Sequence, residues 1–209
     1  MHTYCIYASE NYPYLSKELE RQLGITYKTA WRILHLIRKS LKQNTSPLNG
    51  QVEVDEMFIG GKGDGGTYNE NQSKVIKAKS KVVGAVERGG EIRAKKVDNL
   101  SASTLGTFLE DNVLKENTLL MTDSNNSYDK VASDYNRHTV NHSKREYSRN
   151  GIHINHIESF WGHVKRSTKG TYKTVSKKHL QSYLDAFVWH YNMRHSDRER
   201  FSSLLKAIV

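Results

Sequence analysis

Residues 52–62, VEVDEMFIGGK, decide the fold of this 209-residue chain. Val52 and Val54 alternate with polar residues as in a β-strand, and the alternation breaks around Asp55 and Glu56. A carboxylate inside an apolar strand is costly to bury unless a cation neutralises it. We therefore predict a strand with a functional carboxylate at Asp55, although an aspartate that caps a turn is the ordinary alternative.

The sequence after this strand predicts an α/β fold. Residues 80–99 contain two β-rich runs around Gly89 and Gly90, which predict a hairpin and a three-stranded antiparallel meander. A helix capped by Ser101 or Ser103 is expected, followed by a short buried strand that ends at Asp123. Further elements are listed in order: a helix at 128–135, a strand at 137–142, and helices at 153–168 and 176–194. If the first and fourth strands are neighbours, Asp55 and Asp123 converge.

A third carboxylate comes from the helix predicted over HINHIESFWGHVKR, residues 153–166. Asn155, Glu158, Gly162 and Lys165 are spaced by three, four and three residues, so they share one face of that helix. Gly162 would let a DNA backbone approach that face closely. The alternative is a solvated polar face without a function.

Carboxylates gathered on a rigid scaffold can hold two Mg²⁺ ions about 4 Å apart, one of which activates the attacking oxygen while the other stabilises the leaving oxygen. Mn²⁺ can take the same place. His153 and His156 lie near one helical face, but without a cysteine partner or an HExxH motif they indicate a zinc site only weakly.

The N-terminal part predicts two short helices joined by a tight turn. Leu15, Leu19 and Leu23 form one apolar stripe, and Thr26 can cap a second helix. In a helix-turn-helix the start of the second helix meets DNA, and this start carries the candidate DNA-binding residues Tyr27, Lys28 and Arg32. A purely structural helical hairpin is the alternative. We expect a helix-turn-helix segment at 1–45 and a catalytic core with C-terminal helices at 46–209.

The composition favours a polyanionic partner. The formal net charge is +10, from 32 Lys and Arg against 22 Asp and Glu. The single cysteine, Cys5, excludes a disulfide framework within this chain and a zinc site made of its own cysteines. Apolar runs of membrane-spanning length are absent from the sequence, so we expect a soluble, cytoplasmic and nucleoid-associated protein without a membrane partner.

Five stretches of the chain resemble bacterial insertion-sequence transposases of the DDE class. They are VEVDEMFIGGK, MTDSNNSYDK, RHTVNHSKREYS, HINHIESFWGHVKRSTKGTY and HLQSYLDAFVWHYNMR. The resemblance implies an α/β, ribonuclease-H-like core in which Asp55, Asp123 and Glu158 match the metal-binding triad. Glu158 follows Asp123 by 35 residues and Lys165 follows Glu158 by seven, which is similar to the family's spacing.

Two departures from the family pattern affect what the resemblance implies. Related proteins commonly have a cysteine-rich zinc ribbon before the helix-turn-helix, which a chain with only Cys5 does not provide. In some relatives the third acidic position is Asn, so Asn155 is a candidate metal ligand beside or instead of Glu158.

The sequence thus predicts a transposase that cuts double-stranded DNA at the inverted repeats of its element and joins the ends to target DNA. It would act with two Mg²⁺ or Mn²⁺ ions and as a homo-oligomer on DNA. Candidate phosphate contacts are Lys144, Arg145, Lys165, Arg166 and Lys169. The alternatives are a catalytically inactive, truncated transposase that represses by binding DNA and a junction-resolving or repair nuclease of the same fold.

Overall fold

The computed structural model describes residues 16–60, 79–140, 148, 151–172, 174–195 and 197–208. The chain divides into two compact units: Thr45–His163 form one, and Met1–Asn44 with Val164–Val209 form the other. The division after Asn44 lies next to the boundary expected after residue 45. Residues 164–209, which the sequence analysis assigned to the core, group with the N-terminal helices.

The unit Thr45–His163 contains a five-stranded sheet in the order β3-β2-β1-β4-β5. Its strands are β1 (Leu48–Ile59), β2 (Ser80–Glu87), β3 (Ile92–Val97), β4 (Val113–Asp123) and β5 (Asn136–Val140). β1, β2 and β3 form the predicted antiparallel meander, whereas β4 runs parallel to β1 and to β5. The first and fourth strands are therefore neighbours, as the convergence of Asp55 and Asp123 requires.

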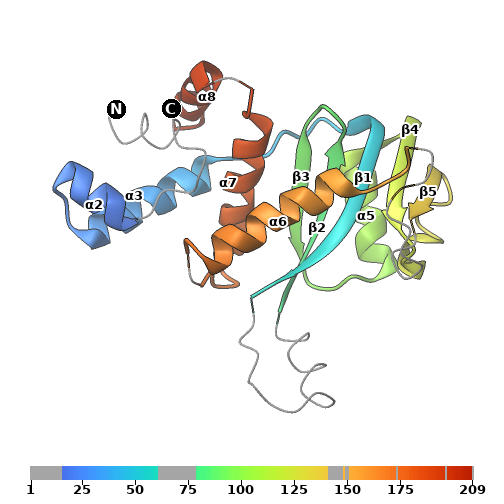
Figure 1. Cartoon of the computed structure of the whole chain (residues 1–209), viewed down its shortest axis with the longest axis horizontal. Coiled ribbons are helices and arrows are strands. Elements are labelled where there is room, and N and C mark those ends of the chain that lie inside the picture. The colour runs from blue at the N-terminus through green and yellow to red at the C-terminus, as the bar shows by residue number, and fades with distance from the viewer. Residues whose placement is uncertain are drawn as a thin grey trace, which may run out of the picture. The chain divides into compact units, whose positions relative to one another are not determined.

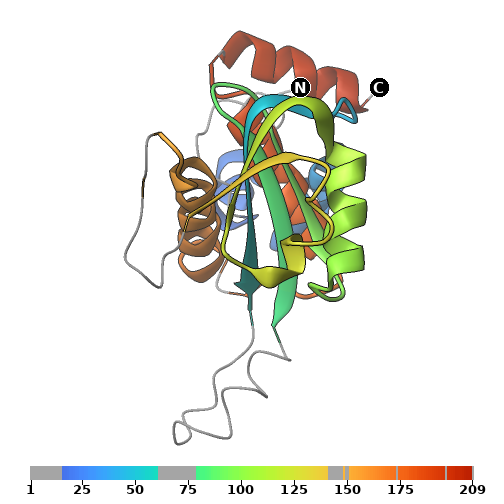
Figure 2. The same cartoon turned by 90° about the vertical axis from the view of Figure 1, so that its right-hand side faces the viewer.

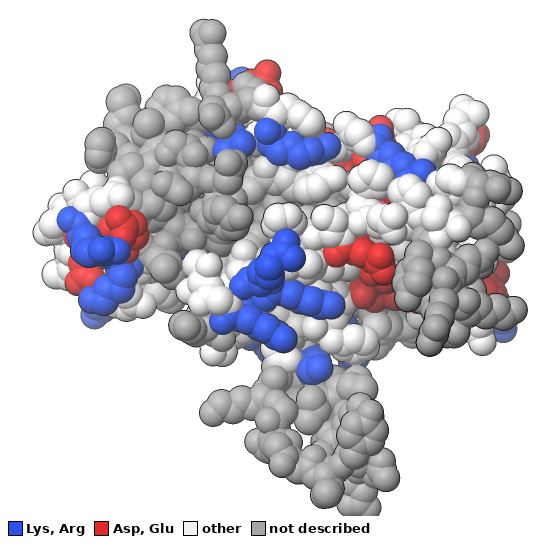
Figure 3. Space-filling model, in the orientation of Figure 1, with Lys and Arg blue, Asp and Glu red and all other residues white. Residues whose placement is uncertain are grey.

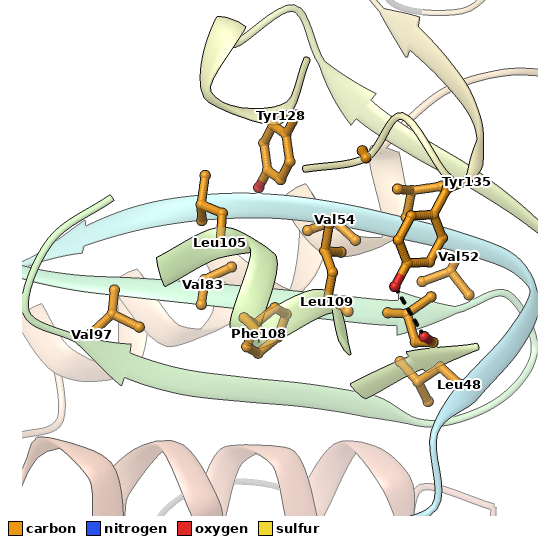
Figure 4. Packing of buried hydrophobic residues seen from close by; sticks show 14 residues of the cluster. Leu48, Val52, Val54, Val83, Val97, Leu105, Phe108, Leu109, Tyr128 and Tyr135 are labelled. Carbon is orange, nitrogen blue, oxygen red and sulfur yellow. Dashed lines mark hydrogen bonds between the residues drawn. The ribbon is translucent and has the colours of Figure 1, made fainter. Parts of the chain in front are cut away.

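Helices cover both faces of this sheet (Figure 2). Helix α5 (Ala102–Asn112) lies on one face, and the first turns of α6 (Asn155–Lys169) lie on the other. Ser101 caps α5 as predicted, because its Oγ accepts from the backbone N–H of Thr104 at 3.4 Å. Figure 4 shows the core under α5, where Leu105, Phe108 and Leu109 pack against valines of the central strands.

The segment 128–135 is not the helix that its sequence suggested. The structure has a three-residue 3₁₀ helix, η1 (Asn126–Tyr128), followed by turns. Ser133 Oγ donates to the carbonyl of Lys130 at 3.0 Å, and such side-chain bonds compete with helical backbone bonds. Tyr128 and Tyr135 are nevertheless buried in the core, and the Tyr135 hydroxyl donates to the Val113 carbonyl at 3.3 Å (Figure 4). In residues 128–135 the spacing of apolar residues thus indicated which side chains are buried, but it did not indicate a helix.

The other unit is helical. Its elements are α2 (Ser16–Leu23), α3 (Tyr27–Ser40), the end of α6, α7 (Leu180–Asn192) and α8 (Asp197–Ile208) (Figure 1). Thr26 caps α3, as predicted, by accepting from the Thr29 backbone N–H. The core joins Leu34 and Ile37 of α3 to Trp189 of α7 and Leu204 of α8, a helix that the sequence analysis did not predict.

The predicted fold class is confirmed. A mixed sheet of this order, with an antiparallel meander followed by parallel strands and helices on both faces, is the ribonuclease-H-like core implied by the family resemblance. Among the described residues, none of the helices combines the length and the apolar character needed to cross a membrane.

Candidate metal centre

The parallel pairing of β1 and β4 brings Asp55 and Asp123 together. The register places Val54 beside Thr122, so the next residue on each strand is an aspartate. Both side chains are partly buried. Asp123 is the last residue of β4, a place where α/β sheets commonly hold site residues, and Asp55 lies beside it within β1. The structure therefore brings together the two aspartates selected from the sequence.

Glu56 is a third carboxylate in this group, and the sequence analysis did not select it. Ligand oxygens of Asp55, Glu56 and Asp123 all lie within 4.8 Å of one another. Its signal in the sequence was the interrupted alternation after Val54, which the analysis used only for Asp55. We call these three residues the acidic group.

The environment of the acidic group raises the pKa of Glu56 to about 7, first through burial and then through the charges of Asp123 and Asp55. Asn125 and the nearby Tyr128 hydroxyl act in the opposite direction. Burial and then the charge of Glu56 also raise the pKa of Tyr128 well above its ordinary value. Glu56 Oε1 is buried and has no hydrogen-bond partner of ordinary geometry within the described part of the chain. An oxygen in this position can accept a cation.

The turn after β4 fixes the position of Asp123. Its Oδ1 accepts from the Asn125 backbone N–H at 3.0 Å, and Asn125 Oδ1 accepts from the Ser127 N–H at 2.9 Å. Arg137 on β5 donates to Thr122 Oγ1 at 2.9 Å and to the Asp123 carbonyl at 3.3 Å. The turn SNNS, residues 124–127, thus holds the aspartate at the strand end.

A buried glutamate of β1 holds the first turn of α6. Glu53 has no exposed surface, and its Oε2 accepts from the backbone N–H groups of His156 and Ile157 at 2.8 and 3.2 Å. The free N–H groups of a helix start need such partners, and a negative charge is favourable there. Glu53 therefore acts as a cap supplied by the sheet, two residues from Asp55.

Arg88 connects this cap to the surrounding chain. Its Nε donates to Glu53 Oε1 at 2.7 Å, while its other nitrogens donate to the carbonyls of Gly151 and His153, both at 2.9 Å. The segment before α6 is therefore bound to the same ion pair as the helix start. The sequence analysis did not select Glu53 or Arg88.

Trp161 fixes α6 at a second point. A Cβ placed on Gly84 would lie 2.7 Å from Trp161 Cζ2, so only glycine leaves room for the indole. Gly84 is the cross-strand partner of Asp55. The ring therefore packs on the sheet beside the acidic group, as expected of a core tryptophan.

Glu158, a predicted ligand on α6, is exposed and is not part of the acidic group, and Asn155, the alternative ligand, is exposed too. Asn155 is the first residue of α6, and Glu158 follows one turn later. The structure thus gathers two of the three predicted acidic ligands and places the third on the helix that Glu53 and Trp161 hold against the sheet.

The predicted DNA-binding residues that the structure describes are exposed. On α3 they are Tyr27, Lys28 and Arg32, and on α6 they are Lys165, Arg166 and Lys169. Figure 3 shows basic side chains gathered over the last turns of α6. Lys144 and Arg145 lie outside the described residues.

The donor set of the acidic group fits a hard divalent cation. Mg²⁺ and Mn²⁺ prefer oxygen ligands, and a cation would neutralise the charges of Asp55 and Asp123, which together with burial raise the pKa of Glu56. The fold and the acidic group together define a ribonuclease-H-like protein with a candidate centre for divalent cations. The chain belongs to the ISXO2-like transposase domain family, whose model matches residues 47–192.

Two proteins from transposable or transposase-like sequences are similar to this chain. An uncharacterized transposase-like protein of Haemophilus influenzae is 31% identical over 114 residues, which is 54% of this chain and 89% of that protein. An uncharacterized protein in the transposable element ISH50 of Halobacterium salinarum is 27% identical over 184 residues, covering 82% of this chain and 62% of that protein.

Two solved structures are similar to this chain at low sequence identity. The intasome of a simian T-cell lymphotropic virus in complex with the PP2A regulatory subunit B56 gamma has a TM-score of 0.40 at 11% identity, covering 84% of this chain and 69% of that chain. The Mos1 strand transfer complex has a TM-score of 0.39 at 11% identity, covering 93% of this chain and 72% of that chain.

Proposed function

We propose that this protein is an active transposase, which cuts DNA at the ends of its insertion element and joins them to target DNA. The convergence of Asp55, Glu56 and Asp123 carries the proposal. The chain belongs to a transposase family and gathers three carboxylates around a buried Glu56 oxygen that has no hydrogen-bond partner of ordinary geometry among the described residues. Cation-dependent chemistry on phosphodiesters accounts best for both observations.

Asp55 and Asp123 would hold two Mg²⁺ or Mn²⁺ ions, with Glu158 or Asn155 as the ligand from α6. When bound, such ions activate the attacking oxygen and stabilise the leaving oxygen. The protein's own part is to orient the ligands: Asn125 fixes Asp123, and Glu53 and Trp161 fix α6. Glu56 adds negative charge beside the two aspartates and so favours cation binding. A covalent link between protein and DNA has no role in this scheme.

Double-stranded DNA would be bound at two basic surfaces. Tyr27, Lys28 and Arg32 at the exposed start of α3 are candidates for recognition of the inverted repeats, as in a helix-turn-helix. Lys165, Arg166 and Lys169 are candidates for phosphate contacts. Because two ends of an element must be processed together, we expect a homo-oligomer on DNA.

The test is cleavage of element-end DNA by the purified protein with Mg²⁺ or Mn²⁺. Asp55→Asn and Asp123→Asn should each lower the cleavage rate by at least about a thousandfold, since several kcal/mol of charge stabilisation are lost. Asp134→Asn, at an exposed aspartate paired with Lys115, is the matched control and should leave the rate unchanged. Metal-dependent cleavage that survives both substitutions contradicts the proposal. Specific binding without any cleavage would instead identify a DNA-binding repressor.

A further inference from the structure

A second group of candidate metal ligands lies at the start of α6. It consists of Glu53, His153 and His156, whose ligand atoms all lie within 4.8 Å of one another. His156 Nδ1 is 2.8 Å and His153 Nδ1 is 3.3 Å from Glu53 Oε1. The two imidazole rings are stacked with their centroids 5.4 Å apart. The group differs from the acidic group in having nitrogen donors.

Glu53 Oε1 has three nitrogen neighbours, which is more than the number of hydrogen bonds that one carboxylate oxygen readily accepts. Arg88 Nε and His156 Nδ1 lie at hydrogen-bonding distance from Oε1, and the nitrogen of His153 is a third neighbour. A carboxylate oxygen offers about two lone pairs. Glu53 Oε2 is already used by two backbone N–H groups. A cation that took one lone pair of Oε1 would leave the other for Arg88 and would use both imidazoles as ligands.

We propose that Glu53, His153 and His156 bind a Zn²⁺-class transition-metal ion. Two imidazoles and one carboxylate are a common three-ligand set for Zn²⁺, with bonds of about 2.0–2.1 Å and so ligand atoms about 3.3 Å apart in a tetrahedral site. The observed 2.8 and 3.3 Å need only small movements. His156 is about half exposed, which leaves a route for the ion and a position for water.

The proposed ion would tie β1 to the first turn of α6. Glu53 belongs to the strand that carries Asp55, and His156 belongs to the helix that carries Glu158. The site is separate from the acidic group, and imidazole ligands select Zn²⁺, Co²⁺ or Ni²⁺ over Mg²⁺. The ion would therefore differ in kind from ions held by the acidic group, and the proposal does not depend on transposase activity.

The experiment is titration of the full-length protein with Co²⁺, whose visible absorption reports nitrogen and oxygen ligands, followed by competition with Zn²⁺. We expect the absorption of nitrogen-ligated Co²⁺ to saturate at one ion per chain in the wild type, and this binding to be at least about tenfold weaker in His153→Gln and in His156→Gln. Glutamine can keep a hydrogen bond to Glu53, and circular dichroism will verify that each variant is folded. His163→Gln, at an exposed histidine of the same helix, is the matched control and should bind as the wild type does.

The double variant Asp55→Asn/Asp123→Asn should keep the Co²⁺ signal, because its substitutions affect only the acidic group. Absence of the signal in the wild type would show that Arg88 and the imidazoles form a closed network without metal, and would overturn the proposal. A signal unchanged in both histidine variants would place the ion elsewhere and would overturn it too.

Discussion

Glu53 and Asp55 lie two residues apart on β1, yet their surroundings are electrostatic opposites. Both point to the sheet face covered by α6, because side chains alternate along a strand. Glu53 is buried against Arg88 and two backbone N–H groups. Asp55 lies with two other carboxylates. Strand β1 thus carries one acid that is paired with an arginine and two members of a group of acids suited to bind a cation.

The largest expected effect on stability comes from Glu53, whose charge is paired with that of Arg88. Glu53→Gln removes the counter-charge of Arg88, whose side chain is only 17% exposed, and one acceptor of the α6 cap. Removing one partner of a buried ion pair typically costs about 3–5 kcal/mol, so we expect a fall of that size in the free energy of unfolding. Urea denaturation followed by circular dichroism measures it.

Glu87→Gln is the control, because the Glu87 side chain accepts, among the described residues, a single 3.3 Å bond from the Asn49 N–H, and the variant should lose about 1 kcal/mol or less. Equal losses in the two variants would show that the Glu53 network does not hold α6.

In the acidic group, removal of a charge should raise the free energy of unfolding, in contrast to the loss expected for Glu53→Gln. Burial and the neighbouring aspartates raise the folded-state pKa of Glu56 to about 7, above its ordinary 4.5. The folded state therefore holds this proton more tightly, and stability falls as pH rises from about 4.5 to 7, by about 3 kcal/mol in total. Glu56→Gln should remove this decline and make the protein more stable than the wild type above pH 7.

Thermal unfolding between pH 5 and 8 measures this difference, with Glu110→Gln on the exposed face of α5 as the control. Mg²⁺ should stabilise the wild type more at pH 8 than at pH 5.5, because it binds the ionised form. A cation effect independent of pH would contradict the assignment of the acidic group as its site.

A smaller loss of stability is expected where Trp161 packs α6 against the sheet. Gly84→Ala places a methyl group 2.7 Å from Trp161 Cζ2, so the indole must move and about 1–3 kcal/mol of stability should be lost. Gly106→Ala is the control on α5. Its methyl group meets only the side chain of Val131, at 3.2 Å, and alanine favours a helix. Equal melting temperatures for wild type and Gly84→Ala would mean that α6 adapts without cost.

The acidic group was easier to predict from the sequence than the ion pair of Glu53 and Arg88. Asp55 could be found because a carboxylate in an apolar strand is conspicuous, and Asp123 because site residues are common at strand ends. Glu56 was missed because strand alternation directs it away from Asp55. The partnership of Glu53 and Arg88 joins residues 35 positions apart through the register of β1 and β2, which spacing does not reveal.

Two other differences have the same cause. The stretch 128–135 has apolar residues at helical spacing, but its polar side chains bond the backbone locally and the tyrosines reach the core from turns. The grouping of residues 164–209 with α3 depends on packing among Leu34, Trp189 and Leu204. Apolar stripes predict that such faces are buried, but they do not identify the partner.

The smallest effect concerns the end of α6, whose exposed basic side chains could contact a polyanion such as DNA. Lys165 lies two turns beyond Glu158 on this helix, so a phosphate contact there would fix DNA along the same face. Lys165→Ala should lower the slope of log affinity against log salt by about one and weaken binding to all sequences alike. Fluorescence anisotropy with element-end and unrelated DNA between 50 and 200 mM salt, roughly the range in which such contacts dominate, measures both quantities. Lys95→Ala, at an exposed lysine of the sheet unit paired with Asp111, should leave the slope unchanged. If the two variants share one slope, the basic end of α6 is a solvated surface, and the orientation of DNA must come from the start of α3 alone.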